Sequence, residues 1–222
     1  MSNGKVVIID YSYLGGLELF KAEDEAFREN NLEVIYAECK TEDDIINVAG
    51  DADAICCCGN PPVTRKVISN LKNCKIIVRY GIGVNSVDLK SATEFNKIVY
   101  FMPGFCAEEL VMHASALILN LLRNVSYYDS RIRRGEWPKA KGIVPKRLSN
   151  LTVGLYGFGA SARPMVQVFK NGFNSTVIAS DPYVKDNMFE KYGIKKVSFD
   201  ELLAQSDIIS IHAPLNNQTR HI

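Results

Sequence analysis

Residues 151–162 read LTVGLYGFGASA, and this stretch decides the fold. The mostly apolar residues 151–156 predict a buried strand, and the glycines that follow predict a tight turn. A strand that runs through G-x-G-x-x-(G/A) into a helix is typical of a dinucleotide-binding turn. Gly157 permits the sharp turn, Gly159 lets the backbone approach a diphosphate, and Ala162 is small enough for the helix to pack closely.

An acidic residue ends the next strand-like run. In STVIASDPY, Asp181 follows Gly157 by 24 residues. A carboxylate at this place hydrogen-bonds the adenosine ribose and repels a 2′-phosphate, which favours NAD over NADP. The alternative is a tight turn and a strand-ending aspartate without a ligand. The predicted cofactor-binding residues of this region are Gly157, Phe158, Gly159, Ala160, Ser161, Asp181 and Pro182.

Two other stretches lie just past predicted strands, where ligands bind in open α/β sheets. In IISIHAPL, His212, Ala213 and Pro214 would line the cofactor, although His212 could simply bond a backbone carbonyl. In IIVRYGIGVNSVD, the glycines of residues 80–83 would expose backbone N–H groups to an anion such as a carboxylate. The alternative there is an ordinary glycine turn before a helix. The predicted substrate-binding residues are Tyr80, Gly81, Ile82 and Gly83.

Short β-branched runs alternate with helical stretches in two separate parts of the chain. This alternation predicts α/β folding with parallel sheets covered by helices. Between the two parts lies a helical pattern at 107–137 without a strand, in which we expect His113 to pack on an apolar face. We therefore expect one domain at 1–100 and a second at 101–222. The expected strands are 5–10, 32–37, 54–58, 74–78 and 97–101 in the first, and 151–156, 176–180, 196–199 and 207–211 in the second.

Composition narrows the possible partners and compartments. The 222-residue chain has a formal net charge of +1 and no long apolar run, so we expect neither a nucleic-acid partner nor a membrane segment. The six cysteines form no CxxC pair or zinc-finger pattern, so we interpret them as free core residues and expect no metal. A protein of this kind without a signal peptide is expected in the cytoplasm.

The sequence resembles the D-isomer-specific 2-hydroxyacid dehydrogenase family, which includes D-3-phosphoglycerate dehydrogenase and glyoxylate/hydroxypyruvate reductase. The resemblance is strongest to the branch that contains the C-terminal binding protein corepressors. It runs from about residue 79 to 222, and the N-terminal residues match only as a flavodoxin-like pattern. The matching stretches are RYGIGVNSVDLKSA, PGFCAEEL, LILNLLR, RRGEW, VGLYGFG, SDPY, DELLAQSD and IHAPLNNQTRHI.

The resemblance implies a flavodoxin-like substrate domain followed by a Rossmann NAD-binding domain. It implies an oxidoreductase that transfers hydride between NAD(H) and a small 2-hydroxy or 2-keto acid. Backbone N–H groups of Ile82 and Gly83 would hold the substrate carboxylate. The residues at 157–162, Asp181, 212–214 and Thr219 would contact the cofactor. Members of the family are usually homodimers, joined through the Rossmann domain and the long helical stretch.

The chain departs from the family pattern in three places. Ala160 and Ser161 replace the usual arginine and aliphatic residue of the loop, and Met112 replaces an acid. The catalytic arginine, glutamate and histidine of the family would follow residue 222, so we expect no catalytic residue within 1–222 and an incomplete Rossmann sheet. The sequence accordingly leaves open a non-catalytic NAD-binding scaffold or regulator, or an inactive truncated fragment.

Overall fold

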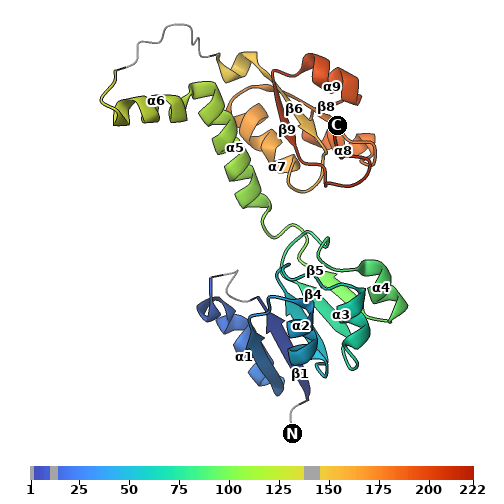
Figure 1. Cartoon of the computed structure of the whole chain (residues 1–222). Coiled ribbons are helices and arrows are strands. Elements are labelled where there is room, and N and C mark those ends of the chain that lie inside the picture. Colours follow the sequence, from blue (N-terminus) through green and yellow to red (C-terminus); the bar gives the residue numbers. More distant parts are fainter. Residues whose placement is uncertain (1–2, 11–14, 138–145) are drawn as a thin grey trace. The chain divides into compact units, whose positions relative to one another are not determined.

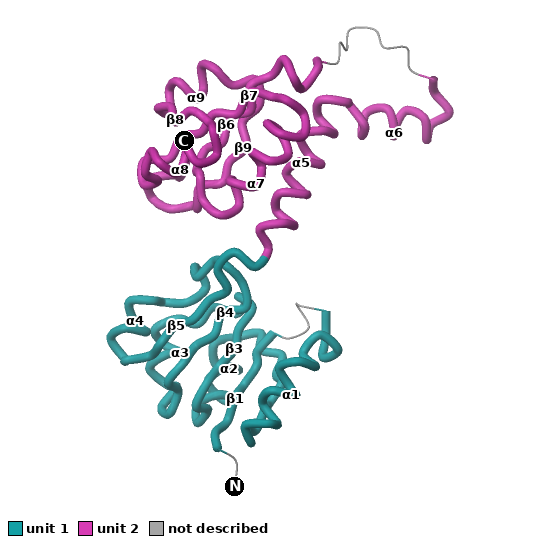
Figure 2. The backbone as a smooth tube through the Cα atoms, turned by 180° about the vertical axis from the view of Figure 1, so that it is seen from behind, with its two compact units in different colours: residues 1–105 teal, residues 106–222 magenta. Residues whose placement is uncertain are grey.

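The computed structural model describes residues 3–10, 15–137 and 146–222. The chain divides into two compact units, unit 1 (Met1–Phe105) and unit 2 (Cys106–Ile222) (Figure 2). Each unit contains its own sheet and its own apolar core. Mixed α/β folding with parallel sheets, as the sequence predicts, is confirmed.

Unit 1 is built on five parallel strands in the order β2-β1-β3-β4-β5 (Figure 1). This is the flavodoxin-like order, in which the chain reverses its direction of winding between β1 and β3. The strands consist mainly of apolar residues, as is usual for a parallel sheet covered on both faces, and only the edge strand β5 is largely exposed among them. The strands are β1 (Gly4–Ile9), β2 (Leu32–Ala37), β3 (Ala54–Cys57), β4 (Ile76–Arg79) and β5 (Ile98–Phe101).

Helices cover both faces of this sheet. Val7 and Ile9 pack with residues of α2, α3 and α4, whereas Val6 and Ile8 pack with Phe20 and α1 on the other face. Thr41 begins α2 with a capping box, in which its hydroxyl accepts the Asp44 N–H. The helices are α1 (Lys21–Glu29), α2 (Glu42–Ala49), α3 (Arg65–Asn70) and α4 (Leu89–Glu94), and the 3-10 turn η2 (Leu17–Phe20) precedes α1.

The cysteines take part in this packing as small apolar residues. Cys56 and Cys57 are buried on opposite faces of β3. Burial raises the pKa of the Cys56 thiol to about 11 and that of Cys57 to about 12, so both are protonated thiols at neutral pH. All six cysteines are free, and Cys106 alone is not fully buried. The prediction of unpaired core cysteines is confirmed for the other five.

Unit 2 contains four parallel strands in the order β8-β7-β6-β9 (Figure 1). Three lie where the sequence predicts them, but the strand expected at 196–199 was placed wrongly. The structure has a strand of only two residues there, β8. The chain leaves the sheet after Lys196 because Ser198 begins the next helix through a capping box with Glu201. The strands are β6 (Thr152–Tyr156), β7 (Thr176–Ser180), β8 (Lys195–Lys196) and β9 (Ile208–Ile211).

The core of unit 2 lies between the sheet and two helices. Val153 and Leu155 of β6 pack against Met165 of α7 and Ile118 of α5. On the opposite face Gly154 lets α9 approach, since a Cβ there would lie 3.0 Å from Leu202 Cδ1. The helices are α5 (Ala107–Arg123), α6 (Val125–Arg133), α7 (Arg163–Val166), α8 (Asp186–Tyr192) and α9 (Phe199–Gln205), with a 3-10 turn η3 (Leu148–Asn150) and a π-helical turn η4 (Gln167–Gly172) that continues α7.

The helical segment expected at 107–137 consists of two helices in the structure. Asn124 adopts a left-handed conformation (φ 54°, ψ 35°) that separates α5 from α6, and α6 ends at Arg133. The Asn124 N–H donates to the carbonyls at the end of α5, and the Asn120 side chain accepts the Ser126 N–H at 2.9 Å. Apolar periodicity continues through the break, so the pattern alone does not reveal it.

The left-handed residue gives a direct test of this break. We expect Asn124→Gly to leave the free energy of unfolding within about 0.5 kcal/mol of the wild type, because glycine adopts positive φ without a steric penalty. Asn124→Ala should lower it by about 1 kcal/mol, since a Cβ disfavours the left-handed region. Urea denaturation measures both. Equal stability of the two variants would contradict the assignment.

Candidate dinucleotide-binding site

The glycine turn after β6 has two glycines with different roles. Gly157 has a φ of 88°, and a Cβ on it would lie 2.7 Å from Ala213 N and 2.9 Å from His212 C. Glycine is therefore required there by the chain that leaves β9. Gly159 has no heavy atom within 4 Å of its Cβ position, so the space beside it is open to a ligand.

Three consecutive N–H groups in this turn are available to a ligand. The N–H groups of Gly157 and Phe158 donate to Ser180 O and to Asp181, but those of Gly159, Ala160 and Ser161 donate to no acceptor among the described residues. Consecutive free N–H groups just before a helix form an anion-binding concavity. This geometry fits a diphosphate.

Asp181 directly follows β7, and its carboxylate hydrogen-bonds both the glycine turn and the residues after β7. Its Oδ2 accepts the Phe158 N–H at 2.8 Å, and its Oδ1 accepts the N–H groups of Tyr183 (2.8 Å) and Val184 (3.1 Å). A carboxylate has about four lone-pair positions, so capacity for about one further donor remains. The structure thus gives Asp181 a structural role that the sequence did not predict, beside the expected contact to a ribose.

A cavity of about 660 Å³ adjoins Asp181. Its acids Asp181, Asp186 and Glu201 outnumber its one cation, Lys196, which bonds Asp186 Oδ1 at 2.9 Å and Val184 O at 2.8 Å. A 2′-phosphate would meet net negative charge here, which favours a nucleoside with a free 2′-hydroxyl. The residues lining the cavity are Tyr156, Ser180, Asp181, Pro182, Asp186, Lys196, Val197, Ser198, Phe199 and Glu201.

Most of these lining residues were missed from the sequence. Five of the missed residues lie at 196–201, between β8 and the first turn of α9, where the sequence pattern predicts a strand at 196–199 and not a helix start. The ring of Phe199 contacts Tyr156 edge-to-face, with ring centroids 5.0 Å apart. The signal that could have located these lining residues is the Ser-x-x-Glu motif at 198–201. This motif follows the lysine pair of β8 and predicts the start of a helix.

His212 follows β9 and bonds two hydroxyl groups. Its Nδ1 lies 3.3 Å from Ser161 Oγ and its Nε2 lies 3.0 Å from Ser210 Oγ. The alternative of a ring bonded to a backbone carbonyl is wrong, because both ring nitrogens have side-chain partners. Burial lowers the pKa of His212 below its ordinary value, so the ring is neutral at pH 7.

The segment after His212 folds back toward the residues that follow Asp181. Thr219 Oγ1 donates to Pro214 O at 2.6 Å and accepts the Asn216 N–H at 2.9 Å, which closes a compact turn. The Tyr183 hydroxyl bonds Gln218 Oε1 at 2.6 Å and so links this turn to the residues after Asp181. Unit 2 therefore brings together the glycine turn, Asp181 and Pro182, Ala213 and Pro214, and Thr219.

In unit 1 the turn at residues 80–83 has the geometry of an anion site. Gly81 has a φ of 151° and its Cβ position is filled by the Arg79 guanidinium, so a side chain there would clash. Ile82 and Gly83 are exposed, and their N–H groups have no acceptor among the described residues. Tyr80 differs from its neighbours, since its ring packs on Phe20 with centroids 5.8 Å apart.

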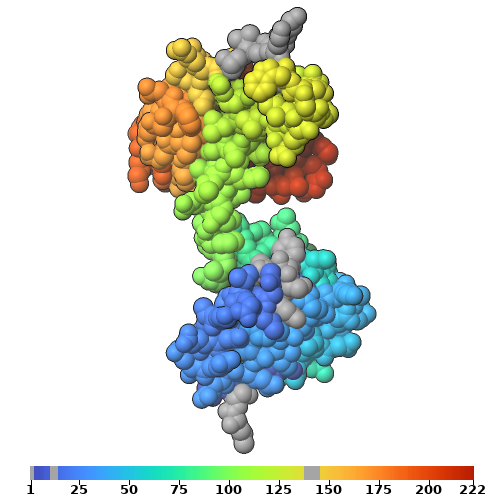
Figure 3. Space-filling model, turned by 90° about the vertical axis from the view of Figure 1, so that its left-hand side faces the viewer, coloured from blue at the N-terminus to red at the C-terminus, as the bar shows by residue number. Residues whose placement is uncertain are grey.

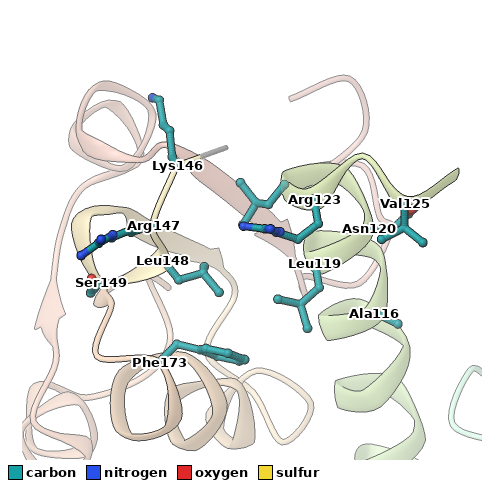
Figure 4. A pocket seen from close by; sticks show the side chains of 11 residues that line it. Ala116, Leu119, Asn120, Arg123, Val125, Lys146, Arg147, Leu148, Ser149 and Phe173 are labelled. Carbon is teal, nitrogen blue, oxygen red and sulfur yellow. The ribbon is translucent and has the colours of Figure 1, made fainter. Parts of the chain in front are cut away.

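Unit 2 has a second, more apolar cavity of about 740 Å³ at the end of α5 (Figure 4). Figure 4 shows Leu119, Leu148 and Phe173 around it. His113, expected to pack within α5, is instead exposed, as are Leu110 and Leu117 beside it. In the described residues no cluster of three or more His, Cys, Asp or Glu could hold a metal, and no helix is long and apolar enough to cross a membrane.

Comparisons with known proteins agree with this geometry. Residues 115–222 match the model of the D-isomer specific 2-hydroxyacid dehydrogenase, NAD binding domain. D-3-phosphoglycerate dehydrogenase of Archaeoglobus fulgidus is 32% identical over 192 residues, which are 86% of this chain and 36% of that protein. Hydroxypyruvate reductase of Thermotoga maritima is 32% identical over 190 residues, which are 85% and 60% of the two chains.

A likeness in structure extends over nearly the whole chain. The apo-structure of D-lactate dehydrogenase from Escherichia coli superposes with a TM-score of 0.75 at 25% identity, and the match covers 98% of this chain and 67% of that one. The chain thus spans 36% of the phosphoglycerate dehydrogenase and 60% of the hydroxypyruvate reductase.

Parallel α/β units and a glycine turn closed by a strand-end carboxylate define a dinucleotide-binding protein of the doubly wound class. Within that class, the chain belongs to the D-isomer specific 2-hydroxyacid dehydrogenase family. The sequence-based predictions of the family and of NAD as the cofactor are confirmed.

The two glycines of the turn should respond differently to alanine. We expect Gly157→Ala to lower the free energy of unfolding by about 2 kcal/mol or more, because the new methyl group overlaps the backbone at Ala213. Gly159→Ala should unfold like the wild type but bind NADH at least about tenfold more weakly, since its methyl group occupies the space of the diphosphate. Thermal unfolding and NADH fluorescence titration separate the two effects. A stable Gly157→Ala variant would contradict the geometry.

Proposed function

We propose that the whole protein is an NAD-dependent oxidoreductase that transfers hydride between NAD(H) and a small 2-hydroxy or 2-keto acid. The observation that carries this proposal is the run of three unbonded N–H groups at Gly159–Ser161 beside Asp181, in a chain of this family. The D-3-phosphoglycerate dehydrogenase and hydroxypyruvate reductase among its relatives support it.

Unit 2 offers the cofactor unbonded backbone N–H donors and an open cavity beside them. N–H groups of Gly159, Ala160 and Ser161 would hold the diphosphate, and the cavity beside Asp181 would receive the adenosine. The bound dinucleotide supplies or accepts the hydride. Ser161 is fixed by the neutral His212 ring, which positions its hydroxyl at the turn without adding charge.

Unit 1 would serve as the substrate domain. In our proposal Tyr80 and Gly81 shape the turn, and Ile82 and Gly83 present unbonded N–H groups to the substrate carboxylate. Reduction of a keto group also needs a cation to orient the acid and a proton donor for the developing alkoxide. We assign neither role to a residue of 1–222. We also propose a cytoplasmic location, because the cysteines are unpaired thiols.

Steady-state oxidation of NADH by the whole protein tests the function. We expect activity with at least one of glyoxylate, pyruvate and hydroxypyruvate, and at least about tenfold lower kcat/KM with NADPH because of the acids around the cavity. Asp181→Asn should raise the KM for NADH, while Asp129→Asn, on exposed α6, should not. Binding of NADH without oxidation by any 2-keto acid would contradict the proposal and favour a non-catalytic scaffold.

A second copy of the chain is the protein partner that we propose. Helices α5 and α6 expose several large apolar side chains, more than isolated surface residues account for. Figure 3 shows these two helices, in green to yellow-green, on the surface of unit 2. These residues are Leu110, Met112, Leu117, Leu121, Val125, Tyr127 and Ile132. A homodimer would bury them.

Mass in solution tests the homodimer. Leu121 is 73% exposed on α5, and we expect Leu121→Glu to shift the mass from dimer to monomer by placing a charge in an apolar interface. The control is Leu203→Glu, which changes an exposed leucine on α9 and should leave the dimer intact. Light scattering after size exclusion measures both variants. A monomeric wild-type protein would contradict the proposal.

A further inference from the structure

One side chain of the glycine turn carries a polar group. Residues 157–162 read GFGASA, and Ser161 is the only one of them with a polar side-chain atom. Its backbone N–H is one of the three without an acceptor among the described residues, and its Oγ is joined to that nitrogen through Cα and Cβ alone. An anion held by this N–H therefore lies within reach of the hydroxyl. The hydroxyl helps to bind the anion only if its hydrogen points toward it.

His212 lies against this hydroxyl and is itself held on its other side. Its Nδ1 is 3.3 Å from Ser161 Oγ, and its Nε2 is 3.0 Å from Ser210 Oγ. Ser210 precedes His212 by two residues at the end of β9, so both side chains leave the same face of the strand. The His212 N–H donates to Tyr156 O at 2.7 Å, which fixes its backbone against the end of β6. Ser210, His212 and Ser161 thus form one connected chain of hydrogen bonds.

The two tautomers of a neutral His212 ring leave Ser161 with different abilities. With its hydrogen on Nε2, the ring donates to Ser210, and Nδ1 accepts the hydrogen of Ser161. Ser161 then offers only lone pairs to a ligand. With its hydrogen on Nδ1, the ring donates to Ser161 Oγ and accepts from Ser210, so the hydrogen of Ser161 is free. Only this second tautomer lets Ser161 donate to an anion.

Charge is absent from this part of the turn. Residues 157–162 include no charged side chain, and burial lowers the pKa of His212, so the ring is neutral at pH 7. The turn must therefore bind an anion through hydrogen-bond donors and dipoles. Hydrogen bonds in a chain polarise one another, so a hydroxyl that accepts from Nδ1–H is a stronger donor than an isolated one. Ser210 contributes to this effect from the far side of the ring.

We propose that His212 and Ser210 are positioning residues that orient the Ser161 hydroxyl as a donor to the diphosphate of the dinucleotide. The Ser210 O–H donates to His212 Nε2, the Nδ1–H donates to Ser161 Oγ, and the Ser161 O–H donates to a phosphate oxygen. Each hydrogen stays on its own atom, and no net charge is added. This inference rests on the proposed function, because it takes the glycine turn as the site of the dinucleotide.

Nitrogen NMR of the imidazole ring tests the tautomer directly, because ring nitrogens with and without hydrogen differ widely in chemical shift. Replacing the other two histidines, in a His113→Gln/His221→Gln chain, leaves only the signals of His212. We expect hydrogen on Nδ1 and none on Nε2 in the complex with ADP-ribose, which contains the diphosphate. Ser210→Ala removes the donor to Nε2 and should raise the fraction of the other tautomer in the free chain. A serine with a merely structural role would not change this fraction.

NADH affinity tests the donor and the way in which Ser210 acts. Ser161→Ala should weaken NADH binding about tenfold, because a hydrogen bond to a charged group is lost. Ser210→Ala should weaken it at least about twofold, because the competent tautomer falls to about half of the population or less. In the Ser161→Ala background, Ser210→Ala should have no further effect. The matched control is Ser69→Ala, an exposed serine of α3 in unit 1, which should keep the wild-type affinity.

Three results would overturn the inference: wild-type affinity in Ser161→Ala, additive effects of the two serine substitutions, or hydrogen on Nε2 in the complex. The tautomer is measured with both serines in place, so that result decides even where a serine variant folds poorly. NADH binding by the wild-type chain would stand in all three cases and would still support the proposed function. Absence of NADH binding by the wild-type chain contradicts the proposed function itself.

Discussion

The close approach of the chain after β9 to Gly157 is the constraint on which the cofactor site depends. At 2.7 Å from the position of a Cβ, the Ala213 N atom leaves room only for glycine. This contact fixes the glycine turn against the end of β9 and brings His212 to Ser161. The N–H groups that face a diphosphate are oriented by backbone packing, and the arginine usual at position 160 in this family is not needed for that orientation.

Asp181 completes this arrangement from β7. Because its carboxylate accepts three backbone N–H groups, it holds both the turn after β6 and the turn after β7 in place before any ligand binds. Preorganisation of this kind lowers the entropic cost of binding. In our proposal the acids around the adjoining cavity select the nucleotide by repulsion, whereas the turn selects it by shape.

Much of this site could be predicted from local sequence. β-Branched runs gave the strands, and the turn and Asp181 follow from a spacing that the chemistry of the dinucleotide demands. The break at Asn124 was missed because apolar periodicity continues across it, and β8 was misplaced because a lysine pair carries no strand signal. The pairing of His212 with Ser161 joins residues 51 positions apart, so it has no local signature.

The most direct test of this account is an amide NMR titration of the isotope-labelled chain with NADH. We predict that the largest chemical-shift changes fall on the amides of Gly159, Ala160 and Ser161, whose N–H groups are unbonded in the structure, and next on residues lining the cavity at Asp181. The same changes should appear with ADP-ribose, which keeps the diphosphate and the adenosine. Shifts confined to other surfaces, or none at saturating NADH, would contradict the assignment of the glycine turn as the dinucleotide site.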